Sequence, residues 1–338
     1  MTPPRGLPSR PPGGRLEVLD ELKGVAIVLI LLYHAGGVMG WRNLLQGQVG
    51  VDMFVFLSGV GLALSTRDAG TLGFLFQRFW RIYPAYWIVL TGFLLADAHF
   101  LGWHFSGVDT ALHYLGIQAL FGPEHEMSVN DSFWFVTLIV CLYLLYAPMR
   151  RLMGRPGWIL LIGIAVSLAP AVAALFSMRA AGFEHIAERV PGFFVGLVVG
   201  RRIRTGELGL SPSKALLGSI VLLVGVPYAC GATIDLALLS LAITAAYAFL
   251  AAPALPGAAR ASLRFLGNRS LEIFLIHQPL IREYNVLVQA RLFPGAPETP
   301  WALALGIALG LTVTIALSVG LHSLLAKVPV PGSSQAHS

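Results

Sequence analysis

Two ionisable side chains lie in apolar stretches long enough to cross a bilayer. His34 is near the end of the first stretch, 18–39, and Asp52 is near the start of the second, 49–66. Histidine is the side chain best suited to accept a proton near neutral pH, and a neighbouring carboxylate can orient its ring. Ionisable groups at membrane depth are costly, and they usually mark functional sites. We therefore predict that His34 and Asp52 are catalytic.

Simpler roles for both residues stay open. His34 could form a hydrogen bond between helices or lie at the membrane–water boundary. Asp52 could cap its helix, because the helix dipole favours an acid in the first turn. A transporter could also use the two residues as a proton relay.

Basic residues lie where an anionic ligand could bind. Arg78 and Arg81 are three positions apart, so they share one face of a helix. Together with Lys23 they could bind the phosphates of a nucleotide-bearing donor, although anchoring at the membrane surface is the common role of such residues. Lys23 precedes His34 by eleven residues, or about 16 Å of helix. An elongated donor bound at Lys23 could therefore reach His34.

A second histidine lies late in the chain, in the segment LGNRSLEIFLIHQPLI. Its polar residues Glu272, His277 and Gln278 predict a helix that lines a cavity, with packing between helices as the alternative. We predict that His277 is catalytic and donates a hydrogen bond to a developing oxyanion. The candidates for the substrate cavity are Tyr33, Ser58, Trp134 and Glu272. The spacing of the histidines from His99 to His125 matches no metal motif, so we expect no metal.

The composition is that of a membrane protein. Of the 338 residues, 56% are hydrophobic and only 12% are charged, against about 25% charged in soluble domains. The sequence predicts an all-α, polytopic membrane helix bundle with about ten transmembrane helices. The predicted spans are 18–39, 49–66, 83–101, 132–149, 157–177, 190–203, 214–230, 233–251, 269–287 and 301–326. They form a single transmembrane domain, 16–328, between disordered tails at 1–15 and 329–338.

The charge distribution predicts the orientation in the membrane. With a cytoplasmic N-terminus, most Lys and Arg fall at cytoplasmic ends of spans, as the positive-inside rule requires. The exceptions are Arg42, Arg179, Arg189, Arg282 and Arg291. The connection 102–131 has acids but neither Lys nor Arg, and it predicts a short interfacial helix. We expect a multi-pass protein of the cytoplasmic membrane with both termini in the cytoplasm. The net charge of +6 then reflects topology, so no nucleic-acid partner is expected.

Five segments carry a family resemblance, and they follow one another in the order LDELKGVAIVLILLYH, GVDMFVFLSG, QRFWRIYPAYW, SFWFVTLIVCLYLLYAP and LGNRSLEIFLIHQP. Together they resemble the acyltransferase 3 family of integral-membrane O-acyltransferases. The resemblance implies a ten-span enzyme that moves an acyl group, usually acetyl from acetyl-CoA, onto a carbohydrate hydroxyl. In that family pattern His34 matches the catalytic histidine, and Arg78 and Arg81 match the basic pair linked to the acyl-CoA. Asp52, Trp134 and His277 match further motif positions.

Two positions depart from the family pattern. Lys23 stands where the family usually has Arg, which keeps the charge but loses the bidentate guanidinium. The residues after Trp134 are Thr137, Leu138, Ile139 and Val140, where many bacterial members have an acidic pair. These departures point to a divergent branch with a different acceptor.

The sequence therefore predicts a membrane O-acyltransferase. Its expected partners are acyl-CoA as the donor, a carbohydrate or glycan precursor as the acceptor, and the lipid bilayer. The alternative is a proton-coupled transporter or flippase for a small anion or a lipid-linked glycan. That alternative predicts flux without acyl-CoA and no need for Arg78 and Arg81.

Overall fold

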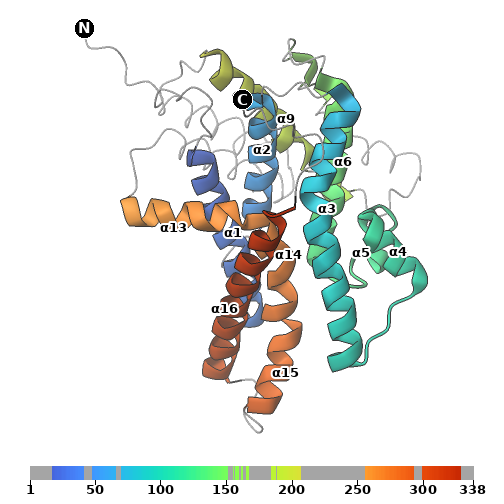
Figure 1. Cartoon of the computed structure of the whole chain (residues 1–338), viewed down its shortest axis with the longest axis vertical. Helices are drawn as coiled ribbons and strands as arrows, with labels where there is room; N and C mark the ends of the chain where they lie inside the picture. The colour runs from blue at the N-terminus through green and yellow to red at the C-terminus, as the bar shows by residue number, and fades with distance from the viewer. Residues whose placement is uncertain are drawn as a thin grey trace, which may run out of the picture.

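The fold is known from a computed structural model of the chain (Figure 1). The structure describes residues 17–41, 48–65, 70–150, 189–206, 256–292 and 299–328, together with short pieces within 155–166 and at 184–187. These described residues form helices and contain no strand, which confirms the all-α prediction. The predicted terminal tails, 1–15 and 329–338, lie outside the described residues.

The helices follow one another with short connections. In chain order they are α1 (Glu17–Val38), α2 (Gln48–Leu64), α3 (Gly70–Ala96), a π-helix (Asp97–Leu101), α4 (Gly107–Leu115), a 3-10 turn (Gln118–Leu120), α5 (Pro123–Glu126), a 3-10 turn (Asp131–Phe133), α6 (Trp134–Met149), α8 (Glu184–Ala187), α9 (Val190–Thr205), α13 (Gly257–Asn268), α14 (Ser270–Ile281), α15 (Glu283–Leu292) and α16 (Pro300–Leu325).

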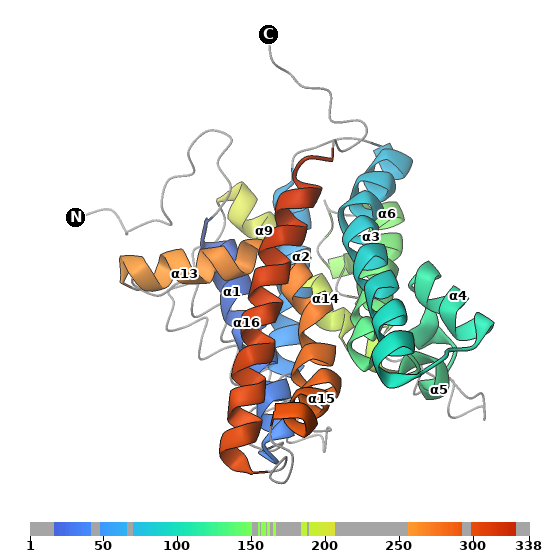
Figure 2. The same cartoon turned by 60° about the horizontal axis from the view of Figure 1, so that its bottom comes forward.

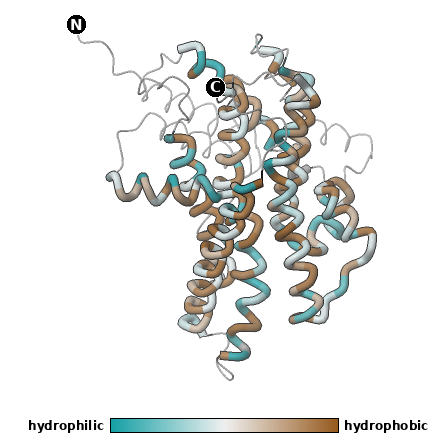
Figure 3. The backbone as a smooth tube through the Cα atoms, in the orientation of Figure 1, coloured by the Kyte–Doolittle hydropathy of each residue, from teal (hydrophilic) through white to brown (hydrophobic). Residues whose placement is uncertain are grey.

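Three helical segments in the described part of the chain are long and apolar enough to cross a membrane. They are Gly70–Leu101, Asp131–Met149 and Pro300–Leu325, and the shorter apolar helices are Val49–Leu64 and Ser270–Ile281. Figure 3 shows these helices as largely hydrophobic. Of the predicted spans, 157–177, 214–230 and 233–251 lie mostly or wholly outside the described residues, so the number ten stays a prediction.

The long helices run roughly side by side, and α13 lies across them (Figures 1 and 2). Helix α1 packs on α2, α13 and α14, while α14 packs on α16. Helix α3 pairs with α6, and the short α4 and α5 lie beside that pair. We call the end of the bundle that holds Glu17 the proximal end, and the end that holds Val38 the distal end.

Helices α2 and α9 pack with their backbones in close contact. A Cβ atom added at Gly59 would lie 2.2 Å from the carbonyl oxygen of Phe193, and one added at Gly196 would lie 2.2 Å from that of Phe56. Small residues permit such an approach between membrane helices. The helices run parallel, so the start of α9 lies near the start of α2.

Three predicted boundaries differ from the structure. Helix α3 begins at Gly70 rather than at residue 83, because residues 70–82 contain no helix breaker and continue into the apolar run. The predicted span 269–287 is divided at Arg282 into α14 and α15, just after Pro279. The amphipathic helix α13 was not predicted, because its mean hydropathy is close to zero.

The connection 102–131 is helical as predicted, but its main helix packs against the side of α3. The hydroxyls of Tyr83 and Tyr86 donate to the carbonyls of Leu115 and His113, at 2.7 Å and 2.6 Å. The indole of Trp87 donates to the carbonyl of Tyr114 at 2.9 Å. These hydrogen bonds attach α4 to one face of α3.

We expect Gly59→Ala to destabilise the protein, since its methyl group would overlap the backbone of α9. Overpacking of this kind costs about 1–3 kcal/mol. Gly61→Ala is the matched control, because the same helix has open space there. Thermal unfolding in detergent should show a lower midpoint for Gly59→Ala alone. Equal midpoints for the two variants would contradict the close packing of α2 and α9.

Candidate functional site

The rings of His34 and His277 are in contact. Their centroids lie 4.8 Å apart with an interplanar angle of 66°, an edge-to-face arrangement. The contact follows from the packing of α1 on α14. Tyr33 lies beside the pair, with its ring centroid 5.2 Å from that of His34. The structure thus joins two predicted catalytic residues that are far apart in the sequence.

The hydrogen bonding of His277 determines its neutral tautomer. Its Nδ1 lies 2.7 Å from the backbone carbonyl oxygen of Phe274, an acceptor, so Nδ1 carries the proton and donates. Its Nε2 is buried and has no hydrogen-bond partner among the described residues. In the neutral ring this Nε2 is an acceptor. The predicted role as an oxyanion donor would require a protonated ring, so His277 is better suited to accept a proton.

An ion pair lies on the distal side of the two histidines. Arg282, at the end of α14, donates from Nη1 to Asp131 Oδ2 at 2.8 Å. Asp131 and Arg282 are the charged residues that act electrostatically on His34. Both side chains are partly exposed to solvent. Polar groups therefore lead from the distal surface toward His34.

Asp52 is bound to an arginine from a distant part of the chain. The Nη1 of Arg189 donates to Asp52 Oδ1 at 2.6 Å, and both side chains are buried. The guanidinium carbon of Arg189 lies 5.2 Å from the ring centroid of Trp134. We predicted that Asp52 orients His34, but the structure assigns it to Arg189, which α9 places against α2.

A series of aromatic contacts connects Trp134 with the two histidines. Trp134 contacts Phe135 at 6.4 Å between centroids, and Phe135 contacts Phe274 at 4.8 Å. Phe274 in turn lies 5.6 Å from His277. We call Trp134, Phe135, Phe274 and His277 the aromatic wall. It places the Asp52–Arg189 pair and the two histidines along one surface.

The three predicted donor-binding residues lie against different helices. Lys23 pairs with Asp20 on α1 at 3.3 Å. The guanidinium of Arg78 lies over the rings of Phe74 and Tyr143, 5.5 Å and 5.8 Å from their centroids. Arg81 is exposed. All three occur in the proximal part of the bundle, but their described contacts do not form one site.

Glu272 does not line a cavity, as we had predicted. Its Oε1 lies 2.8 Å from Nδ1 of His322, so the pair links α14 to α16. Its role in the structure is to hold two helices together. Ser58 is half-buried on α2, beside the close contact at Gly59.

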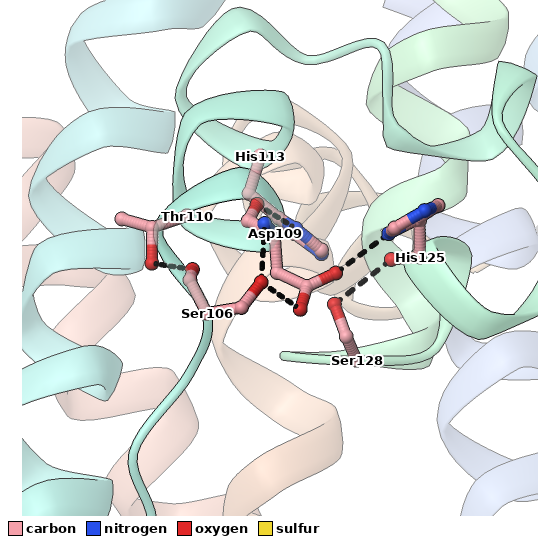
Figure 4. Close-up of polar contacts among 6 residues, drawn as sticks. All are labelled: Ser106, Asp109, Thr110, His113, His125 and Ser128. Carbon is pink, nitrogen blue, oxygen red and sulfur yellow. Dashed lines mark hydrogen bonds and ion pairs between the residues drawn. The ribbon is translucent and has the colours of Figure 1, made fainter.

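The histidines of the connection 102–131 stabilise its fold (Figure 4). Asp109 accepts hydrogen bonds from the Ser106 hydroxyl at 2.5 Å and from His125 Nδ1 at 2.8 Å. These two contacts, that of Ser106 first, hold the pKa of Asp109 below its usual value. His113 bonds the backbone carbonyl of Asp109, and burial lowers the pKa of its ring. The described residues contain no cluster of three or more His, Cys, Asp or Glu that could hold a metal.

Comparison with known proteins identifies the family. A family model described as an acyltransferase domain matches residues 16–322, so the chain belongs to the acyltransferase 3 family. The chain is 25% identical over 153 residues to a protein named as an acetyltransferase in Acidianus two-tailed virus, covering 44% of this chain and 45% of that protein.

A second relative is named as a membrane-bound transacylase in Komagataeibacter xylinus. The chain is 35% identical to it over 95 residues, which cover 27% of this chain and 22% of that protein. The matches thus span less than half the length of either relative. No solved structure matches the chain. Together with the apolar helices, the family places this chain among membrane-bound acyltransferases.

Sequence reasoning assigned no role to Arg189, Asp131 or Arg282. One signal pointed to two of them, because Arg189 and Arg282 are exceptions to the predicted charge asymmetry. An arginine at the sparsely charged end of a membrane protein needs a partner there. The structure shows these partners as Asp52 and Asp131.

We expect Glu272 and His322 to contribute jointly to stability. Glu272→Ala and His322→Ala should each lower the free energy of unfolding, and the double variant should lose less than the sum. A coupling energy of about 1 kcal/mol is typical of residues in direct contact. Chemical denaturation of the four proteins measures it. As a control, Glu272→Ala combined with His104→Ala, an exposed residue of the connection, should be additive. Additive losses for Glu272 and His322 would rule out the pair.

Proposed function

We propose that this acyltransferase is an acyl-CoA-dependent membrane O-acyltransferase that moves an acyl group, acetyl in the first instance, onto a hydroxyl of a carbohydrate or glycan precursor. The observation that carries the proposal is the contact between His34 and His277. It brings a proton-accepting pair together within the membrane bundle of a chain that belongs to an acyltransferase family.

In the proposed reaction His34 acts as the general base. It takes the proton of the acceptor hydroxyl as that oxygen attacks the thioester carbonyl. The carbon–sulfur bond then breaks, and the CoA thiolate leaves with the proton that His34 returns to it. His277, with Nε2 as an acceptor, would bind the ring N–H of His34 and hold its other nitrogen toward the hydroxyl. His277 thereby takes the role that we had predicted for Asp52.

The two substrates would approach from opposite ends. The donor phosphates would bind at the proximal end, where Lys23, Arg78 and Arg81 supply positive charge. The acceptor would enter at the distal end, beside Asp131 and Arg282. We place the proximal end in the cytoplasm, with both termini there and the bundle in the cytoplasmic membrane. This orientation follows the positive-inside rule and matches the cytoplasmic supply of acyl-CoA.

Donor binding can be tested without knowing the acceptor. We expect the detergent-solubilised protein to bind acetyl-CoA saturably and Arg78→Ala/Arg81→Ala to bind it much more weakly, because two charge-assisted contacts to phosphate are lost. His34→Ala should bind it as the wild type does. Isothermal titration calorimetry measures all three. If folded, monodisperse wild-type protein binds neither acetyl-CoA nor longer acyl-CoAs, the transferase proposal fails, and acyl-CoA-independent flux in vesicles becomes the assay.

Catalysis should depend on both histidines. We expect His34→Ala to reduce transfer of labelled acetyl from acetyl-CoA to membrane glycans by about 10²–10⁴-fold, the usual contribution of a general base. His277→Ala should also reduce it, while the exposed His104→Ala serves as the control. Release of free CoA thiol gives an independent rate. Full activity of His34→Ala would contradict the mechanism.

A further inference from the structure

Arg189 is a buried cation in a segment that matches none of the family motifs. It lies at the start of α9, with its side chain only 7% exposed, and that of Asp52 is 1% exposed. Nη1 donates to Asp52 at 2.6 Å, and the guanidinium lies on the face of Trp134. Asp52 and Trp134 both belong to motifs that the family shares. Arg189 therefore joins two motif residues that the sequence keeps far apart.

Helix packing alone does not require this ion pair. Desolvation of two charges offsets most of their attraction, so apolar residues of similar volume often pack at least as stably. The α2–α9 interface is already closely packed at Gly59 and Gly196. A buried guanidinium at membrane depth is therefore better explained by a ligand.

The guanidinium has a hydrogen-bond donor to spare. Its Nε is buried and has no hydrogen-bond partner among the described residues. A buried donor without a partner costs about 1–3 kcal/mol. Since Asp52 balances the charge of Arg189, the site as a whole is close to neutral. A neutral carbonyl oxygen suits this N–H better than a phosphate would.

The position of Arg189 lies on the route from the proximal end to the histidines. Gly50 packs against the backbone of Ala26, which places the start of α2 beside the middle of α1. His34 lies eight residues beyond Ala26, about 12 Å further toward the distal end. The aromatic wall runs from Trp134, beneath Arg189, to His277.

We propose that Arg189 binds an amide carbonyl of the pantetheine arm of the acyl donor, with Asp52 and Trp134 fixing the guanidinium. This inference rests on the proposed function. Acyl-CoA carries neutral amides between its phosphates and its thioester. With the phosphates at the proximal end and the thioester at His34, the amides pass the aromatic wall at Arg189. The pair thus recognises the uncharged middle of the donor.

Two ligands separate this site from the phosphate site. CoA contains the pantetheine arm, whereas 3′-phospho-ADP has the same phosphates without it. We expect Arg189→Lys, which keeps a cation for Asp52 but removes Nε–H, to weaken CoA binding about tenfold, the effect of one hydrogen bond to a charged group. Its affinity for 3′-phospho-ADP should stay within about twofold of the wild type. Calorimetry on the full-length protein measures both.

Control variants make the result specific. Arg291→Lys, an exposed arginine near the distal end, should change neither affinity. Arg78→Ala/Arg81→Ala should weaken both ligands alike. If Arg189→Lys does not fold, the neutral pair Asp52→Asn/Arg189→Gln replaces it, with the same expected loss for CoA alone.

The outcomes distinguish this inference from the proposed function. Equal losses for the two ligands, or no loss for CoA, would overturn the assignment of Arg189 and leave the transferase proposal standing. If the wild-type protein binds neither CoA nor 3′-phospho-ADP, the proposed function itself fails, and the inference falls with it.

Discussion

The contact between His34 and His277 depends on the register between α1 and α14, and that register is set at the other end of the bundle. Gly267 packs so closely on α1 that an added Cβ would lie 1.8 Å from the carbonyl oxygen of Asp20. Arg260 pairs with Glu21 at 2.9 Å, and Arg264 pairs with Glu17. Because α14 follows α13 after a single turn, this attachment fixes how far α14 rises along α1 and brings His277 level with His34.

The buried charges occur as neutral pairs at successive depths. Asp52–Arg189 lies between the proximal end and the histidines, and Asp131–Arg282 lies on their distal side. A lone charge in this environment would cost several kcal/mol, roughly, so each cation requires its own acid. The histidine pair between them is uncharged when both rings are neutral. The bundle can therefore pass polar substrate groups while keeping its own interior electrically balanced.

Hydropathy predicted the helices with long, sharply bounded apolar runs, and α1, α2, α6 and α16 lie within two residues of their predicted ranges. It missed α13, whose stability comes from ion pairs with α1 and not from apolar character. For the site, the motifs predicted which residues matter but not their partners. Asp52 and His34 are close in sequence, yet Asp52 pairs with Arg189 and His34 with His277, because helix packing brings distant segments together.

The departure from the family pattern after Trp134 has a physical counterpart in the structure. Many members resembling this chain carry an acidic pair there, whereas this chain has the fully buried Thr137 one turn after Trp134. Arg189 lies on the face of Trp134. A further carboxylate on that face of α6 would add negative charge near a guanidinium that Asp52 already neutralises. With threonine the surroundings of Arg189 stay close to neutral, as a site for an uncharged amide requires.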